Sequence, residues 1–250
     1  MLARYDAIGR DYTRTRREDP GLRARISAAL GDARTVVNVG AGAGAYEPTD
    51  RGVVAVEPSA VMIAQRPPGS APVVRASAGR LPFPDASRDA ALAILSVHHW
   101  DGERERGVRE LRRVARETVV ILTYDARVSG TMWLMADYLH EVASLDHRIF
   151  PVPEQLAGWL GGRVDVDVLP IPRDTPDWML GSFWAHPERV LDPAARAATS
   201  GFARMPPDIV ARVVAAVGRD LANGRWDARH GALRRLHAYD AGLRLVIARP

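Results

Sequence analysis

The stretch VVNVGAGAG, residues 36–44, decides the fold. Its valines indicate a strand that is buried on both faces, and Gly40, Gly42 and Gly44 follow that strand directly. Glycine adopts backbone conformations that other residues avoid, so this spacing predicts a tight turn whose amides can approach a ligand. A ligand bound there would lie at the carboxyl ends of the strands of an open α/β sheet.

Apolar runs and helical periodicity alternate on both sides of this stretch. Strands are expected at residues 53–56, 72–76, 89–97 and 118–123, and helices at residues 20–30 and 103–116. After Tyr124 only residues 163–169 and 242–248 have a strand pattern. The alternation predicts an α/β fold with right-handed βαβ units and a mostly parallel sheet.

The chain of 250 residues is expected to form one domain over residues 1–250. The core half is expected at about residues 20–125. Insertions at about residues 126–162 and 172–241 are helical and aromatic, since five of the six tryptophans follow Tyr124. We interpret them as a cap over one domain. Residues 196–205 are expected to be a loop that precedes a helix at residues 208–222.

Composition excludes several classes of function. The 34 basic residues, all arginine, are interspersed with 30 acidic ones and leave a net charge of +4, so no nucleic-acid-binding stripe is expected. The chain has no cysteine, which excludes disulfides and thiolate zinc sites. No apolar run approaches the length of a membrane helix, and the first residues carry charges where a signal peptide is apolar. We therefore expect a cytoplasmic protein with neither nucleic acid nor membrane as partner.

Glu57 ends the second strand, thirteen residues after Gly44. A carboxylate at this place can accept hydrogen bonds from both hydroxyls of a ribose. The alternative is a turn residue at a strand end, before Pro58. Together with the glycines, Glu57 favours a bound nucleoside.

Four segments together resemble the class I S-adenosylmethionine (SAM)-dependent methyltransferases. They are residues 38–44, then Glu57 with Ser59 and Met62, then Leu81-Pro82-Phe83, and then His98-His99-Trp100. The resemblance is to the small-molecule branch that includes menaquinone- and ubiquinone-type enzymes, often called methyltransferase type 11, and covers residues 5–124. It implies a Rossmann-like, mostly parallel seven-stranded sheet with helices on both faces and a helical cap. It also implies SAM as cofactor, S-adenosylhomocysteine (SAH) as product, and methyl transfer to an O, N or C atom of a small apolar or aromatic acceptor.

The resemblance also implies which residues bind the cofactor. The glycines would pass beneath the methionine part of SAM, Glu57 would hold the ribose, and Met62 would pack on the adenine. The full set is Tyr5, Tyr12, Arg16, Asn38, Gly40, Gly42, Gly44, Glu57, Ser59, Met62, Ser77, Ala78, Gly79 and Ser96. Two positions depart from the family pattern: Asn38 replaces an acidic residue that charge-pairs the SAM ammonium, and Ser77 replaces an Asp that often meets the adenine. Both departures predict weaker binding of the cofactor.

His98 and His99 are the candidate catalytic residues, because they end the fourth strand where the donor methyl group would be exposed. Either imidazole can act as a general base for an acidic O–H, N–H or C–H acceptor. In an extended strand the two would point to opposite faces, and His99 is favoured because the residue before the Trp is often polar in similar families. The alternative is that they only shape the pocket.

The acceptor is expected to contact Tyr124 and Asp125, which end the fifth strand, and an aromatic wall. The wall residues are Trp133, Tyr138, Trp178, Phe183 and Trp184, for which core packing is the alternative. No metal site is expected, because the spacing of His98, His99, Asp125 and His140 matches no ligand motif.

Two other functions stay open. Gly40, Gly42 and Ala45 also satisfy the dinucleotide pattern Gly-x-Gly-x-x-Ala, so an NAD(P)-dependent oxidoreductase is an alternative. The helix before the first strand and the later Leu-Pro-Phe and His-His-Trp segments favour SAM. A SAM-binding protein that transfers no methyl group, such as a sensor or a cyclase-like enzyme, is the other alternative. The expected partner is a small-molecule acceptor, and the expected assembly is a monomer or a homodimer.

Overall fold

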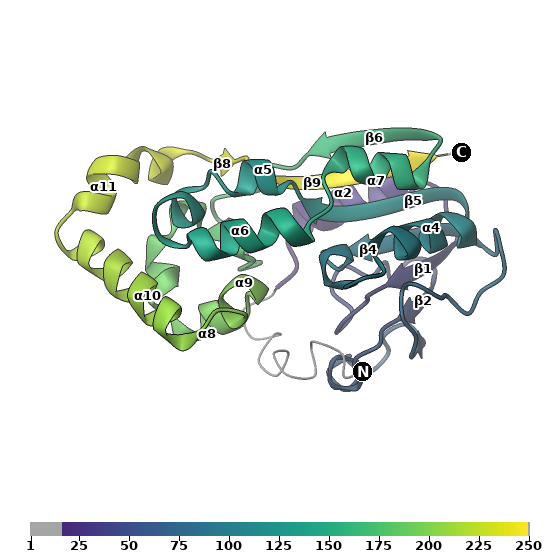
Figure 1. Ribbon diagram of the computed structural model, residues 1–250. Helices are drawn as coiled ribbons and strands as arrows, with labels where there is room; N and C mark the ends of the chain where they lie inside the picture. Colours follow the sequence, from purple (N-terminus) through teal and green to yellow (C-terminus); the bar gives the residue numbers. More distant parts are fainter. Residues whose placement is uncertain (1–16, 250) are drawn as a thin grey trace.

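A seven-stranded sheet forms the centre of the computed structural model, which describes residues 17–249 (Figure 1). Its strands are β1 (Thr35–Val39), β2 (Gly52–Val56), β3 (Val73–Val74), β4 (Arg88–Ile94), β5 (Ala115–Tyr124), β6 (Arg163–Val168) and β9 (Leu243–Arg249). The order is β3-β2-β1-β4-β5-β9-β6, and β9 alone runs antiparallel to the other six strands. The predicted mostly parallel seven-stranded α/β sheet is confirmed.

The buried strands alternate their side chains between two helical layers. On one face, Val36 of β1 packs with α2 (Pro20–Leu30), through Ile26 among others. On the other face, Val37 packs with α4 (Arg104–Val114) and α7 (Pro153–Leu160). Asp19 starts α2 by accepting a hydrogen bond from the Leu22 N–H at 3.0 Å, and a short helix, α3 (Ala60–Ala64), follows β2.

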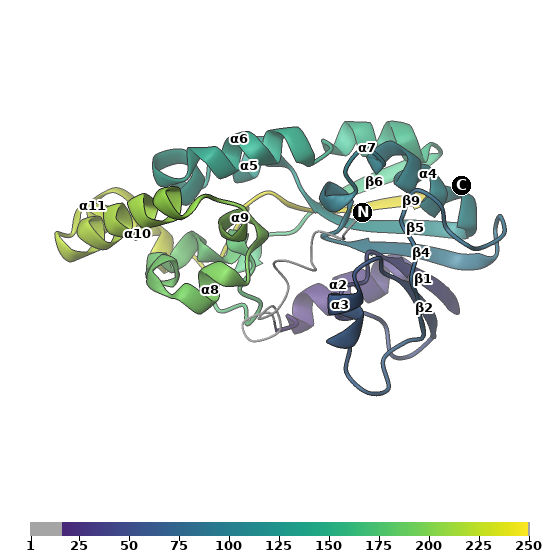
Figure 2. The same cartoon turned by 60° about the horizontal axis from the view of Figure 1, so that its bottom comes forward.

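The rest of the chain forms a helical region at one end of the sheet (Figures 1 and 2). This is the end where the parallel strands finish, because α5 (Ala126–Ser129) follows β5 directly. The other elements are η3 (Leu134–Tyr138), α6 (His140–Ile149), β7 (Ile171–Pro172), η4 (Leu180–Ala185), η5 (Pro187–Leu191), α8 (Pro193–Ala197), α9 (Ser200–Ala203), α10 (Pro207–Ala222), α11 (Arg225–His230), η6 (Gly231–Arg235) and β8 (Ala238–Tyr239). None of the helices described is long and apolar enough to cross a membrane.

Two expected elements differ from the structure. The fourth strand ends at Ile94 rather than at residue 97, and Val97–His99 form a 3₁₀ turn, η2. Residues 196–205 are not a loop, since they hold the end of α8 and all of α9. Asp192 caps α8 by accepting from the Ala194 N–H at 2.8 Å, and Gly201 lets α9 pack closely against Leu180.

Candidate functional site

The loop after β1 can be built only with glycine at its first position. Gly40, Gly42 and Gly44 all have positive φ angles, of 68°, 52° and 95°. The N–H groups of Gly40 and Ala41 both donate to the Val56 carbonyl, at 2.8 and 3.1 Å, which ties the loop to the end of β2. A Cβ atom on Gly40 would lie 2.5 Å from the Cβ of Ser96, so the loop passes directly against the end of β4.

Glu57 fixes the same loop from the other side. Its buried carboxylate accepts hydrogen bonds from the N–H groups of Gly42 and Ser59, each at 2.8 Å. Ser59 in turn caps α3 by accepting from the Met62 N–H at 3.2 Å, and Met62 then packs against Gly42. These two hydrogen bonds place the carboxylate between the glycine loop and the start of α3, at the end of β2.

Asn38 belongs to a buried polar cluster that was not predicted from the sequence. Its Nδ2 donates to Oε1 of Glu47 at 3.1 Å, and Oε2 of Glu47 accepts from Arg66 at 2.6 Å. The side chains of Glu47 and Arg66 are only 7% and 5% exposed. Among residues 17–249, Oδ1 of Asn38 has no hydrogen-bond partner, although it is buried. No motif marks this cluster, because Glu47 and Arg66 lie in loops 9 and 28 positions after Asn38.

His98 and His99 lie side by side on η2, with ring centroids 3.8 Å apart. The expectation that they point to opposite faces is therefore wrong, because the strand ends before them and a 3₁₀ turn does not alternate. His98 is buried and stacks on Phe150, at 4.0 Å between centroids and 21° between planes, whereas His99 is only partly buried. Tyr124 meets the same Phe150 edge-on at 6.0 Å. Phe150 was not predicted, since it reaches His98 from the end of α6.

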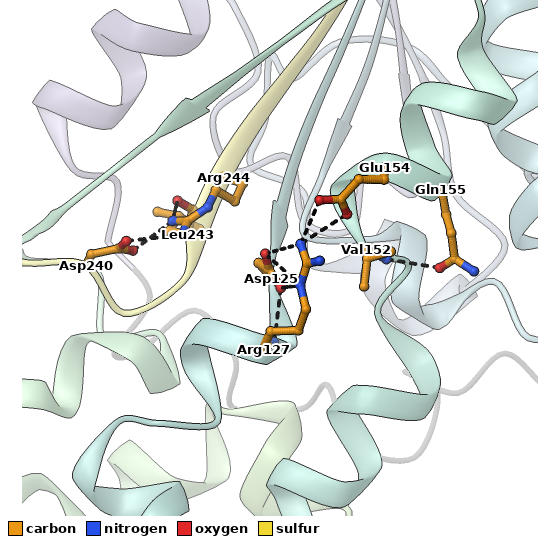
Figure 3. A network of polar contacts seen from close by, with 8 residues as sticks. All are labelled: Asp125, Arg127, Val152, Glu154, Gln155, Asp240, Leu243 and Arg244. Atoms are coloured by element: carbon orange, nitrogen blue, oxygen red, sulfur yellow. Dashed lines mark hydrogen bonds and ion pairs between the residues drawn. The ribbon is translucent and has the colours of Figure 1, made fainter.

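Asp125 lies at the end of β5 but is engaged in an ion-pair network (Figure 3). It caps α5 by accepting from the Arg127 N–H at 3.0 Å, and its two oxygens also accept from the Arg127 guanidinium. These side-chain hydrogen bonds hold the pKa of Asp125 below its usual value. Arg127 bonds Glu154 at 3.0 Å as well, so the network connects the end of β5 to α7.

Four residues of the predicted aromatic wall lie in the apolar core of the helical region. Trp133 donates from Nε1 to the Trp184 carbonyl at 3.0 Å, and Trp184 donates to the Ile171 carbonyl at 3.1 Å. The Tyr138 hydroxyl donates to Asp220 at 2.8 Å. Phe183 is fully buried beside them. Trp178 is half-buried, with the Arg189 guanidinium 4.5 Å above its ring.

The remaining predicted positions lie between β3 and β4 or outside the described part of the chain. Ser77, Ala78 and Gly79 lie between β3 and β4, and a Cβ atom on Gly79 would lie 2.7 Å from the carboxyl carbon of Glu103. Tyr5, Tyr12 and Arg16 lie outside the described residues. Within residues 17–249, no group of three or more His, Asp and Glu side chains is arranged to hold a metal ion.

Comparison with known proteins agrees with this geometry. A family model described as a methyltransferase domain matches residues 37–123. A crystal structure from Anabaena variabilis, of a protein assigned as a methyltransferase from an antibiotic biosynthesis pathway, superposes with a TM-score of 0.87. The two chains are 29% identical, and the match covers 95% of this chain and all of the other. The chain thus carries a methyltransferase domain and has the Rossmann-like fold of the SAM-dependent methyltransferases.

More distant structures share the fold of this methyltransferase. A phosphoethanolamine N-methyltransferase 2 from Haemonchus contortus, in complex with SAM, has a TM-score of 0.59 at 15% identity. That match covers 97% of this chain and 56% of the other. The YcgJ protein from Bacillus subtilis has a TM-score of 0.54 at 16% identity, covering 92% and 99% of the two chains. A search of curated proteins found no match.

The residues of this methyltransferase fit SAM, its cofactor. The positive φ angles of the loop leave a backbone surface without side chains, as a closely approaching ligand needs. Asn38 supplies a buried acceptor that has no partner within residues 17–249, and Glu57 supplies a carboxylate at the end of the neighbouring strand. The dinucleotide alternative is not supported, because the family model and the Anabaena structure both belong to methyltransferases.

Proposed function

We propose that this methyltransferase acts on an O, N or C atom of a small apolar or aromatic metabolite. The observation that carries the proposal is the ring cluster of His98, His99, Tyr124 and Phe150 at the carboxyl ends of β4 and β5. Ser96, which contacts the glycine loop at Gly40, is two residues away from this cluster. A flat acceptor could lie against these rings next to the cofactor.

The similarity to the Anabaena protein supports a small acceptor, because antibiotics are small molecules. We assign acceptor binding to the helical region at the carboxyl ends of the strands, within the insertions expected at about residues 126–162 and 172–241 (Figure 2). The first insertion is only partly a cap, because α7 at its end packs on the face of the sheet with Val37. Trp178 is the half-buried member of the predicted aromatic wall, so among the wall residues it is the most accessible to an acceptor. Asp125 contributes by fixing the start of α5, since its carboxylate is bound to Arg127.

We assign cofactor binding to the loop and its supports. Glu57 accepts from the ribose hydroxyls, Met62 packs on the adenine, and the glycines pass beneath the methionine part. When bound, SAM supplies a methyl group on a sulfonium, which is a good leaving group. The protein aligns the acceptor with that methyl group and excludes water, which accounts for much of the rate in a displacement of this kind.

We assign His99 as the general base. His99 would accept the proton that the acceptor atom loses as it is methylated, so that the methylated acceptor, SAH and a protonated imidazole would be the products. Imidazole is suited to this role because its ordinary pKa is close to 7. His99 is more exposed than His98, which is buried under Phe150 and therefore forms part of the pocket wall.

His99→Ala should lower turnover by about 10²- to 10⁴-fold, which is the usual contribution of a general base. The measurement is SAH formation with phenols and nitrogen heterocycles as acceptors, over a range of pH. The variant should retain SAM affinity within a few-fold and lose the acidic limb of the rate profile. His147→Ala is the matched control, since His147 is exposed on α6. Turnover of His99→Ala within about threefold of the parent would show that alignment alone carries the transfer.

A further inference from the structure

Glu47 and Arg66 form a buried ion pair directly beneath the glycine loop. The distance from Oε2 of Glu47 to the guanidinium is 2.6 Å, and both side chains are almost fully enclosed. Arg66 also reaches the carbonyl oxygens of Gly42 and Ala71, at 3.3 and 3.1 Å. The charge of Glu47 is thus compensated by Arg66, and Arg66 also contacts the glycine loop at Gly42.

This pair determines which way the amide of Asn38 faces. A carboxylate only accepts hydrogen bonds, so the group of Asn38 that faces Glu47 must be its NH₂, as the 3.1 Å contact from Nδ2 shows. Oδ1 must then face the opposite way. Asn38 is 1% exposed, and its Oδ1 has no hydrogen-bond partner among the described residues. A buried acceptor in this state is suited to accept a hydrogen bond from a ligand.

We propose that Glu47 is a positioning residue for SAM, because it holds the Asn38 amide with Oδ1 ready to accept a hydrogen bond from the cofactor's ammonium group. This rests on the placement of SAM proposed above. The strong donors of SAM are the adenine amino group, the ribose hydroxyls and the ammonium. Glu57 and Met62 lie at and after the end of β2, and they take the ribose and the adenine. Asn38 lies on β1, between β2 and β4, and so meets the opposite, methionine end.

At position 47, only a carboxylate can accept hydrogen bonds from both Asn38 and Arg66 in their present orientations. Asn38 and Arg66 each present a donor to it, and a glutamine has one acceptor and one donor in the same place. With Glu47→Gln, either Arg66 loses its partner or the Asn38 amide turns over and presents NH₂ to the ammonium. Both outcomes disturb the methionine end of the site and leave the adenosine end unchanged.

The test compares ligands that do and do not carry the ammonium. Calorimetry should show that Glu47→Gln lowers the affinity for SAM and SAH at least tenfold. The ligand 5′-methylthioadenosine, which lacks the amino-acid part, should bind to the variant with the same affinity as to the parent. Glu57→Ala should lower the affinity for all three ligands by a similar factor. Equal weakening of all three by Glu47→Gln would overturn the inference. If Glu57→Ala changed no affinity, the proposed placement of SAM itself would be wrong, and the two failures are therefore distinguishable.

A compensating pair of substitutions separates positioning from simple damage to the loop. In Asn38→Asp/Glu47→Gln, the new amide can donate to Asp at 38 and accept from Arg66, so every group again has a partner. The second oxygen of that Asp would face the ammonium with a negative charge. SAM affinity should return to the parent value or exceed it. Failure of the folded double variant to recover SAM affinity would overturn the inference.

Discussion

Gly40 shows at the scale of one residue how tightly the cofactor loop is fitted to the sheet. Its φ of 68° disfavours any side chain, and an added Cβ would lie 2.5 Å from Cβ and 2.7 Å from Oγ of Ser96. Ser96 is itself held by a hydrogen bond from its hydroxyl to the Val39 carbonyl at 2.9 Å. The contact cannot relax easily, because Ser96 is buried and its hydroxyl is bound to the strand β1.

Gly40→Ala should therefore lower SAM affinity at least tenfold and destabilise the fold by about 1 to 3 kcal/mol, the usual cost of overpacking. Affinity is measured by calorimetry and stability by denaturant unfolding. Gly31→Ala is the matched control, because Gly31 has a similar φ of 54° but nothing within 4 Å of its Cβ position. If both variants lost the same stability and neither lost affinity, backbone strain rather than contact with Ser96 would be the cause.

Residue by residue, the sequence predicted the positions that a local motif marks. The sequence could identify Gly40, Gly42, Gly44 and Glu57, because each lies at or directly after the end of a predicted strand. Glu47 and Phe150 could not. Glu47 matters through its contacts with Asn38 and Arg66, and Phe150 through its contact with His98, 52 positions earlier in the chain. Such pairs are created by the tertiary fold.

At the scale of the element, η4 packs against the end of β5 through a glycine. A Cβ on Gly181 would lie 2.5 Å from the Tyr124 hydroxyl and 2.9 Å from Cδ1 of Ile171. Gly181→Ala should destabilise the protein by about 1 to 3 kcal/mol, because η4 must move away from β5. Unfolding of the single variants and of Gly181→Ala/Tyr124→Phe gives a double-mutant cycle. A coupling energy of about 0.5 kcal/mol or more is expected, and a value near zero would mean that the contact carries no strain.

Helices and strands with a clear periodicity of apolar residues were predicted well. Elements whose formation depends on tertiary contacts were not. The helix expected at residues 20–30 is α2 at the same bounds, and all seven strands are present. The start of the 3₁₀ turn was interpreted as strand because the apolar run of β4 continues, apart from Ser96, to Val97. Residues 196–205 looked like a loop, since α8 and α9 depend on the cap at Asp192 and the close packing at Gly201.

At the scale of the whole molecule, the sheet and the helical region share their interior. One apolar cluster contains Ile26 and Val36 on the sheet side and also Trp184 and Trp226 in the helical region. Buried Tyr46, at the end of the cofactor loop, adds a polar link. Its hydroxyl accepts from the Asp19 N–H at 3.0 Å and donates to Asp177 at 2.9 Å. The cofactor loop is thereby joined to the helical region, so the two are expected to unfold together.

The stability of the whole fold should depend on pH through Asp146 on α6. Burial raises the pKa of Asp146 to about 7, from an ordinary value of 3.8, against the opposing charges of Arg204 and His147. Between these two pH values the folded protein keeps a proton that the unfolded chain has lost. The contribution of this group to stability is thus fully present below about pH 4 and is lost as the pH rises to about 7 and beyond.

Asp146→Asn removes this titration and keeps the shape of the side chain. The variant should gain stability relative to the parent as the pH rises from 5 to 8, by on the order of 1 kcal/mol or more, since each pKa unit corresponds to about 1.4 kcal/mol. The measurement is urea unfolding of both proteins at several pH values. Taking the difference cancels carboxylates such as Asp125, whose lowered pKa changes stability in the opposite direction at acid pH. A difference that stays constant from pH 5 to 8 would show that Asp146 is ionised in the folded protein throughout.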